Sequence, residues 1–591
     1  MIYIPSRETK QLVQSNRSKI FGNIWSSFNL DLKSSLGLIR VSPRLRVNTS
    51  GVTNQGISVA FRNYDQRIFT IAGTRIFKNT TTNDLTTAFV EDASTGAKTD
   101  YDPNYSDMEF FNSVLCATTP TKLVSKAEDG SGTGAWTERA TLTTSTSLHK
   151  LHYFRKYDRL YFIDEFKKIK SIDTSWSVAT SGSDYAIDLT YNNGVPYCLA
   201  SDSNDIWIGT IIQNNASIVN NFQGASILRW DGIDSQITAE YRIKAQGVLA
   251  LCKDDKGLMH AIDTNGSLIA FNGDGFSEIG RLPVNKNILA NATTGLYNSF
   301  IHPNGFTYSK NGTFLVLVNN LNGDNGSTIN ENLPSGIWEW SSETGFVHRQ
   351  SVTYNTLANS TITDYGQNRV SRVGALYEPN IYNSGSGGKP TLICGVTYYT
   401  DASSTTSGIF VDDPNDTIQK YGYLVTSWIL SQNIKDTWNN VYSRHKSLLD
   451  SSDRIVMKYR TREESATEAS ITWTLTNAFT TTTDLSGMVG YEVEVIQGTG
   501  SGKCAHITAV TGSGTYTITL DEDFTGVSGT AKVRVQNWTK SGVVSSQSDE
   551  FYKFTIGKTS ERVQIKCCVL FTGEDELYEL ALSNVVHTEL K

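Results

Sequence analysis

The sequence predicts an all-β protein with a β-propeller of six or seven blades, followed by a β-sandwich that carries an inserted small β domain. Three observations support this fold class. A two-strand phrase recurs along about the first 420 residues, Gly, Ser, Thr and Asn are abundant, and the sequence pattern changes after residue 415. A repeat of this length is typical of arrays of small sheets.

The repeated phrase is an apolar strand, a tight polar turn and a second strand that often ends in Asp, Asn-Gly or Asp-Gly. Clear copies are 160–164 (LYFID) with 168–173 (KIKSID), and 259–263 (MHAID) with 267–273 (SLIAFNG). The first strands of the copies are marked by Ile68, Leu115, Tyr161, Trp207, His260, Leu315 and Leu392. The spacing, roughly 45 to 55 residues with a longer last step, fits propeller blades, and we count seven copies.

A propeller explains the phrase better than a row of β-sandwiches, which also shows regular strands and turns. One small twisted sheet cannot bury both faces, whereas sheets stacked around an axis cover each other. The phrase also keeps its internal order from copy to copy. Extra length falls in Gly- and Asn-rich segments such as 319–326 and 383–388, which predicts loops on one rim.

The chain divides into four parts by sequence pattern. Residues 1–50 contain strands without the phrase and are expected to form a docking segment, and 51–415 form the propeller. Residues 416–463 and 538–591 are expected to form the sandwich. The insert, 464–537, shows the strict alternation of half-exposed strands. A possible short helical turn is limited to 437–449.

Composition excludes several classes of protein. The formal charge of −7 is small for 591 residues and no long basic run occurs, so we expect no sequence-specific nucleic-acid binding. No apolar run reaches membrane-spanning length, and the first residues lack the features of a signal peptide. The seven cysteines (Cys116, Cys198, Cys252, Cys394, Cys504, Cys567 and Cys568) are scattered, which predicts buried thiols in a reducing cytosol.

Two motifs that suggest chemistry fail on inspection. The segment 498–503 (GTGSGK) resembles a phosphate loop, but Gln497 and Cys504 stand where the pattern needs Gly and Ser or Thr, so we expect a hairpin turn. The segment 127–136 resembles a sialidase Asp-box, but Ala127 replaces its Ser and Trp136 is two residues too far from Asp129. No paired carboxylates or nucleophile constellation stands out, so we expect no enzyme, no catalytic residues and no cofactor.

Metal and binding sites receive weak support from the residues. The loop 320–326 (NLNGDNG) has oxygen ligands that Ca²⁺ could use, but Asn, Asp and Gly are also ordinary turn residues. His149 and His152 are close together without further ligands, so we assign no metal site. Aromatic residues near turns remain as candidates for contacts with sugars or proteins, with packing between sheets as the alternative: Trp176, Trp338, Trp340, Tyr398 and Tyr399.

The blade phrases 206–210 with 227–232 and 266–283, together with the module around 438–459 and the Gly-rich insert, resemble tailed-bacteriophage virion proteins of the β-propeller type. The resemblance implies a tail or nozzle component that forms a multi-copy ring, a homo-oligomer in contact with other virion proteins such as adaptor or portal-proximal components. It would be made in the host cytoplasm, reside in the virion tail, and take part in host attachment or genome delivery. The alternatives are an adhesin that binds a host surface glycan and a sialidase-like propeller that cleaves one.

Overall fold

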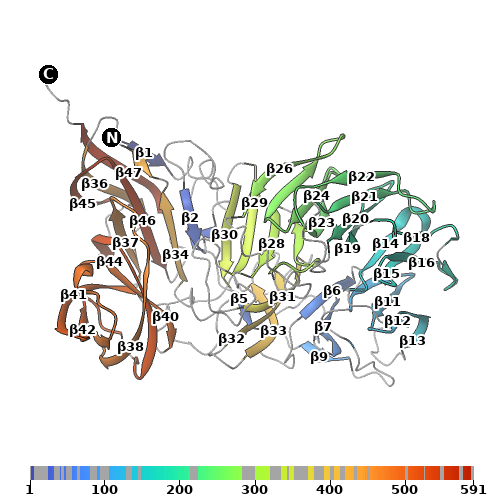
Figure 1. The fold of residues 1–591 in the computed structure, drawn as a ribbon, viewed down its shortest axis with the longest axis horizontal. Helices are drawn as coiled ribbons and strands as arrows, with labels where there is room; N and C mark the ends of the chain where they lie inside the picture. Colours follow the sequence, from blue (N-terminus) through green and yellow to red (C-terminus); the bar gives the residue numbers. More distant parts are fainter. Residues whose placement is uncertain are drawn as a thin grey trace.

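The computed structural model gives an all-β protein, as the sequence predicts, with a propeller, a sandwich and an inserted barrel (Figure 1). It describes residues 2–5, 24–28, 30–31, 40–41, 45–47, 56–62, 67–72, 74–79, 89–92, 101, 106–127, 136–143, 148–179, 182–192, 194–212, 224–282, 300–309, 311–319, 335–342, 345–351, 370–378, 392–399, 405–412, 420–426, 428–430, 436–445, 448, 453–498, 504–524, 526–545, 551–571 and 577–586. The elements bounded within these residues are strands and two 3₁₀ turns, Arg155–Tyr157 and Ser486–Met488.

The propeller consists, in the described residues, of seven antiparallel sheets that follow one another along the chain. The first is β6 (Gly56–Arg62), β7 (Arg67–Ala72), β8 (Arg75–Asn79) and β9 (Phe89–Glu91). The second is β10 (Met108–Phe111), β11 (Val114–Thr118), β12 (Lys122–Ala127) and β13 (Thr137–Thr141). The third is β14 (Leu151–Phe154), β15 (Arg159–Asp164), β16 (Lys168–Ile172) and β17 (Val178–Ala179), with β18 (Ile187–Asp188) also on β16.

The remaining four propeller sheets repeat this antiparallel order. The fourth is β19 (Val195–Ser201), β20 (Ile206–Ile211), β21 (Ser226–Trp230) and β22 (Ala239–Arg242). The fifth is β23 (Val248–Lys253), β24 (Met259–Asp263), β25 (Ser267–Phe271) and β26 (Phe276–Arg281). The sixth is β27 (Phe306–Tyr308), β28 (Phe314–Val318), β29 (Gly336–Ser341) and β30 (Gly345–Ser351). The seventh is β31 (Val370–Tyr377), β32 (Ile393–Tyr399), β33 (Thr405–Asp412) and, from the N-terminal segment, β5 (Leu45–Val47).

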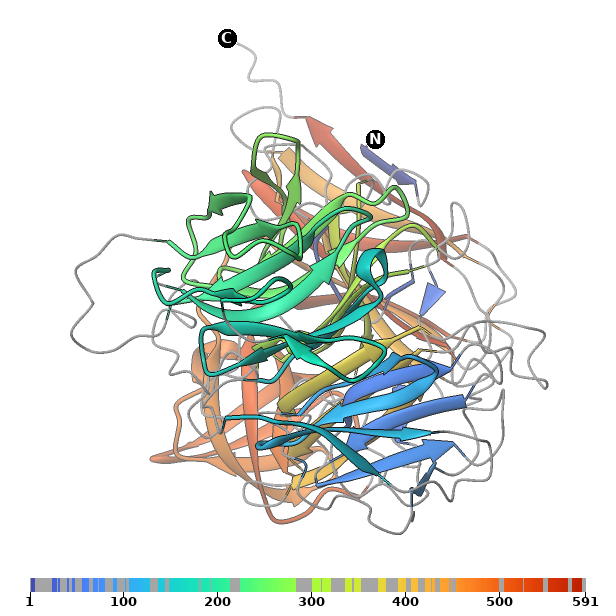
Figure 2. The same ribbon diagram turned by 90° about the vertical axis from the view of Figure 1, so that its right-hand side faces the viewer.

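The sheets close into a ring through their first strands. Each of β6, β10, β14, β19, β23, β27 and β31 contacts the first strand of the next sheet, and β31 contacts β6. Figure 2 shows the molecule with the propeller end toward the viewer. In Figure 1 the blue strands β6 and β7 lie beside the yellow strands β31 and β33, where the ring closes. Apolar clusters fill the spaces between neighbouring sheets, so each sheet covers the next one.

The two-strand phrase forms the middle hairpin of each sheet. Its first strand corresponds to β15 in the third sheet and to β24 in the fifth, while its second strand corresponds to β16 and β25. Residues of these middle strands are almost all buried, because a neighbouring sheet covers each face. This double burial explains why the first strand of the phrase is almost continuously apolar, as in β20 and β28, and why it gave the strongest signal.

The sandwich has two sheets that face each other across one apolar core. One sheet is β1 (Ile2–Pro5), β47 (Leu577–Val586), β36 (Asp436–His445) and β45 (Phe551–Ser560). The other is β2 (Ile24–Phe28), β34 (Lys420–Thr426), β46 (Arg562–Phe571), β37 (Arg454–Arg460) and β44 (Thr539–Ser545), with β35 (Ile429–Leu430) also on β46. Trp438, Phe554, Ile455 and Val563 belong to the shared core, and Val347 of the propeller joins it.

The N-terminal segment is divided between the two large units. Strands β1 and β2 pair with β47 and β34 of the sandwich, whereas β5 pairs with β33 and completes the seventh propeller sheet. A short pair, β3 (Leu30–Asp31) and β4 (Arg40–Val41), lies between them, and β2 and β3 both contact β30 of the propeller. The strands expected in residues 1–50 therefore dock on sheets of their own chain.

The insert is a closed six-stranded barrel in the order β38, β39, β42, β41, β40, β43. Its strands are β38 (Thr467–Leu475), β39 (Ala478–Thr481), β40 (Glu492–Gly498), β41 (Cys504–Ser513), β42 (Thr515–Leu520) and β43 (Thr530–Gln536). Alternate residues such as Ile471, Phe479, Val493 and Ile518 fill the interior. Closure removes exposed strand edges and gives the barrel a core of its own.

The expectation of a helical turn within 437–449 is wrong, because Asp436–His445 is strand β36. This strand pairs with β45 on one side and β47 on the other, and its register shifts between Trp438 and Asn440 in both pairings. The irregularity brings Trp438 and Val441 into the same core although they are three residues apart. In the sequence, that spacing resembles the period of a helix.

Candidate functional site

The axis of the propeller holds a polar hub centred on Asp107. Its Oδ2 accepts hydrogen bonds from Lys150 Nζ at 2.6 Å and from the Leu151 backbone N–H at 2.9 Å. Its Oδ1 accepts one from Asn304 Nδ2 at 2.8 Å. Asp107, Lys150 and Asn304 lie at or near the starts of the second, third and sixth sheets, so the hub connects sheets that are not all neighbours in the ring.

Two titratable residues follow the hub on the same inner strands. Burial raises the pKa of Glu109 to about 7; Asp107 adds to this rise and Lys150 opposes it. Burial also lowers the pKa of His152 to about 3, and Lys150 and Lys253 lower it further. Near neutral pH the histidine is therefore uncharged, and the Glu109 carboxyl is the axial group that gains or loses a proton.

The hub is better suited to hold sheets together than to perform chemistry. The Asp107 carboxylate already accepts three hydrogen bonds from groups of the protein, out of about four that a carboxylate can accept. In the part of the chain that the structure describes, no group of three or more His, Cys, Asp or Glu side chains is placed to hold a metal ion. We assign the hub a role in fixing the ring.

A buried ionic joint connects the barrel to the sandwich. Glu492 of β40 accepts from Lys566 of β46, and its Oε1 lies 3.1 Å from the Nζ atoms of both Lys458 and Lys566. Burial alone would raise the pKa of Glu492, but the two lysines hold it well below its usual range. Burial alone would lower the pKa of each lysine, and Glu492 keeps both raised. All three groups are therefore charged over the ordinary pH range.

Aromatic rings complete the joint. The Nζ of Lys566 lies 4.9 Å from the centroid of Tyr423 and 5.7 Å from that of Trp538. The guanidinium of Arg460 lies 4.5 Å from the centroid of Trp538, which is in the connection between β43 and β44. Because these contacts come from both connections between sandwich and insert, they fix the orientation of the barrel.

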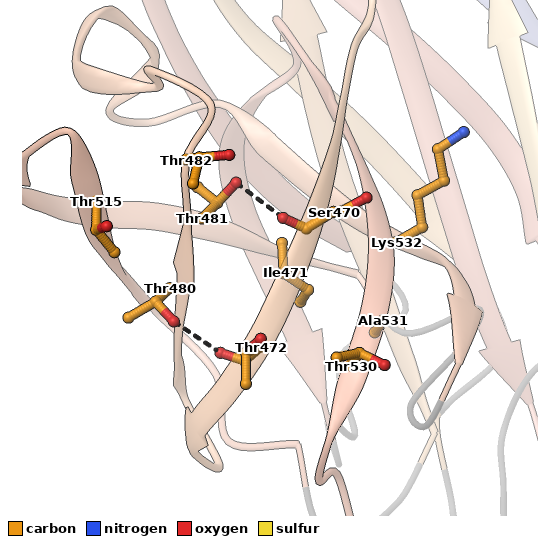
Figure 3. Close-up of a pocket in the computed structure, with 10 residues that line it drawn as sticks. All are labelled: Ser470, Ile471, Thr472, Thr480, Thr481, Thr482, Thr515, Thr530, Ala531 and Lys532. Atoms are coloured by element: carbon orange, nitrogen blue, oxygen red, sulfur yellow. Dashed lines mark hydrogen bonds between the residues drawn. The ribbon is translucent and has the colours of Figure 1, made fainter.

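A hollow on the outer wall of the barrel is the third polar feature (Figure 3). It has a volume of about 610 Å³ and lies across β38 and β39, with contributions from β42 and β43. The lining is Ser470, Ile471, Thr472, Thr480, Thr481, Thr482, Thr515, Thr530, Ala531 and Lys532. Seven of these ten side chains carry a hydroxyl and one, Lys532, carries a charge, so the wall combines hydroxyl groups with the methyl groups of its threonines.

The rim aromatics proposed from the sequence are mainly packing residues where their side chains are described. Trp338 is 3% exposed and belongs to a core between sheets, and Trp340 packs against the same core. Trp176 is half-buried against Phe111, with the Arg139 guanidinium 4.0 Å from its ring centroid. The side chains of Tyr398 and Tyr399 lie outside the described residues.

The other sequence motifs take structural roles or lie outside the described residues. Strands β40 and β41, which flank 499–503, pair antiparallel, and residues 499–503 themselves lie outside the described residues. Trp136 packs edge-to-face on Tyr101. His149 is buried between the carbonyls of Ile163 and Pro120 at 2.8 and 3.2 Å. The Asn-rich loop 320–326 is not among the described residues. All seven cysteines are free thiols, five of them buried.

The hydroxyl-lined hollow and the joint were missed by the sequence reasoning. Lys458, Glu492 and Lys566 are far apart in the sequence, and each looks like an exposed residue of an alternating strand. The threonines of the hollow also read as the outer positions of half-exposed strands. Only the pairing of β38 with β39 and β43 brings them together, and no local signal gives that register.

Comparisons with known proteins were made for the whole chain. No protein-family model matches it, and no curated protein does. One similar solved structure is the extracellular domain of the hybrid two-component system BT3049 from B. thetaiotaomicron, with 11% identity, TM-score 0.39, and coverage of 81% of this chain. This chain spans about half (48%) of that one. Another is BBS1N in complex with ARL6DN, with 11% identity, TM-score 0.36, and coverage of 64% of this chain and 99% of that chain. We infer no activity from either protein.

Proposed function

We propose that this chain is a structural virion protein of a tailed bacteriophage, a tail or nozzle component that assembles in several copies through protein–protein interfaces. The observation that carries the proposal is that the N-terminal segment forms strands in both the sandwich and the propeller. Strands β1 and β2 enter the sandwich, β5 enters the propeller, and β2 and β3 contact β30 between them.

The connection of both large units by one segment favours a role as a rigid structural component. The N-terminal segment pairs with the sandwich through β1 and β2 and with the propeller through β5, and Val347 of β30 packs in the core of the sandwich. The buried joint at Glu492 then fixes the barrel on the sandwich. A body built in this way transmits force between its outer faces, as a component between neighbouring proteins of a particle must. Within the residues described above, no helix is long and apolar enough to cross a membrane.

The test uses the phage that encodes the chain. Mass spectrometry of purified virions should detect the protein at several copies per particle, and particles produced without it should lack a complete tail. Electron microscopy of the purified full chain, alone and with its virion neighbours, should show rings. A chain absent from purified virions, with particles unchanged when it is withheld, would refute the proposal.

A further inference from the structure

The hollow on the barrel has the size of a small-molecule site, and the strands that line it belong to a closed barrel. Its volume of about 610 Å³ lies within the range of about 300–1,000 Å³ that ligand pockets occupy. The strands that line it belong to a closed barrel whose inward residues Ile471, Phe479 and Ile518 form one core. The hollow therefore keeps its shape without help from the rest of the chain.

The hydroxyls of the wall come from matched positions on neighbouring strands. Thr472 of β38 pairs with Thr530 of β43 on one side and with Thr480 of β39 on the other. Thr480 in turn pairs with Thr517 of β42. Because alternate residues of a strand face the same side, these hydroxyls lie in a row across the outer face. Threonine loses little side-chain freedom on binding, since its χ1 is already restricted.

Most of these hydroxyls have capacity to spare. Thr481 is committed, because it donates to the Ser470 carbonyl at 2.9 Å, and Thr480 donates to the Thr472 carbonyl at 3.4 Å (Figure 3). Among the residues that the structure describes, the hydroxyls of Ser470, Thr472, Thr482, Thr515 and Thr530 form no hydrogen bond with one another or with other groups. Each can donate one hydrogen bond and accept others.

The chemistry of the wall selects against three kinds of occupant. An anion would need a free cation, but Lys532 is paired with Glu468 and extends away from the hydroxyls. A purely apolar ligand would cover the hydroxyls of the wall without giving them hydrogen-bond partners, which costs free energy. A protein segment would be held mainly by aromatic and arginine anchors, and the ten lining residues include neither.

We propose that this hollow, defined by Ser470, Thr472, Thr482, Thr515 and Thr530, binds a neutral saccharide. Sugar hydroxyls donate and accept hydrogen bonds, as threonine hydroxyls do, and a mono- or disaccharide fits the volume. The inference is independent of the virion role proposed above, because it rests on the barrel alone. It places glycan recognition on the insert and not on the aromatic residues of the propeller.

The test uses the full chain and a set of neutral probes. Glycan-array screening with hexose and N-acetylhexosamine oligosaccharides selects a probe, and saturation-transfer NMR titration then measures its dissociation constant. Thr472→Val and Thr515→Val each keep the shape of the side chain and its β-propensity but remove the hydroxyl. We expect each to weaken binding about 2- to 10-fold, and the double variant more strongly.

The matched control is Thr511→Val, an exposed threonine on β41 of the same barrel that does not line the hollow. It should bind the probe like the natural chain, and all variants should keep the thermal midpoint. Binding that is weakened by the two hollow variants and unchanged by the control supports the proposal. It is overturned if no neutral probe binds, if only acidic glycans bind, or if the double variant binds as well as the control. None of these results depends on whether the chain is found in virions.

Discussion

Replacement of Glu492 by glutamine should loosen the barrel from the sandwich. The side chain of Glu492 is 2% exposed, and it is the counterion that contacts both Lys458 and Lys566 at 3.1 Å. Glu492→Gln keeps the size of the side chain but leaves two buried ammonium groups without that charge. Breaking a buried ion pair from one side costs about 3–5 kcal/mol, and we expect a loss of this order in the free energy of opening the joint.

Native-state hydrogen exchange measured by mass spectrometry suits this test, because a chain with several units does not unfold in one step. Peptides covering β37, β40 and β46 should exchange about 10²–10³-fold faster in Glu492→Gln, while peptides of the propeller should be unchanged. The control is Glu463→Gln: its carboxylate is 61% exposed, and its pair with Arg460 at 3.5 Å should contribute about 0–1 kcal/mol.

The pH dependence of the same variant provides a second check. The pKa of Glu492 is depressed in the folded protein, so its contribution is present above the unfolded pKa of about 4.3 and is lost as pH falls through the folded value. The difference between the natural chain and Glu492→Gln should therefore be equal at pH 7 and pH 5.5 and shrink only in stronger acid. A difference below about 1 kcal/mol at pH 7, or one that vanishes by pH 5.5, would refute the reasoning.

Three further predictions concern the propeller. Because the pKa of Glu109 is raised from 4.5 to about 7, the folded state should lose about 3 kcal/mol of stability as pH rises between these values. Glu109→Gln should remove this loss in thermal melts at pH 4, 6 and 8. A pH profile that is the same in the variant and in the natural chain would contradict the prediction. Asp107→Ala removes the acceptor for Lys150, Leu151 and Asn304. Hydrogen exchange should therefore become faster in β10, β14 and β27 together. A change confined to β10 would show that the hub does not couple the sheets. In Gly209→Ala the new Cβ would lie too close to Cys198 Sγ and Val248 Cγ1, so we expect the free energy of unfolding to fall by about 1–3 kcal/mol. The control Gly487→Ala has open space around its new Cβ and should leave the thermal melt unchanged.

The sequence predicted the propeller through its middle strands, and the physical reason is their burial. Residues such as Leu160, Phe162 and Ile262 lie between two sheets, so both faces of the strand need apolar side chains. The first strands of the sheets gave no comparable signal. They face the axis, where Asp107 and Lys150 meet, and two of them, β10 and β14, are only four residues long. A strand that is polar at one end and apolar at the other has no clear period.

The features that depend on pairing across long sequence distances could not be predicted. Strands were expected within residues 1–50, where β1, β2 and β5 lie, but nothing in a short strand specifies which sheet it joins. Lys458 and Lys566 show the same limit, since each interrupts an apolar strand in the way an exposed lysine does. Their burial is decided by the inserted barrel, which covers them with Glu492.

Charge is distributed differently at the junctions and on the outer wall of the barrel. The most deeply buried ionic groups at the axis and the joint, Asp107 and Glu492, each contact partners from more than one element. Buried ion pairs add little net stability compared with apolar packing, but they are costly to break, so they favour one geometry over its alternatives. The hollow has the opposite character, because its hydroxyls are neutral and only those of Thr480 and Thr481 donate hydrogen bonds within the barrel. Because the Glu492 joint fixes the barrel on the sandwich, it also holds the hollow, and the saccharide site that we propose there, in a constant orientation to the sandwich.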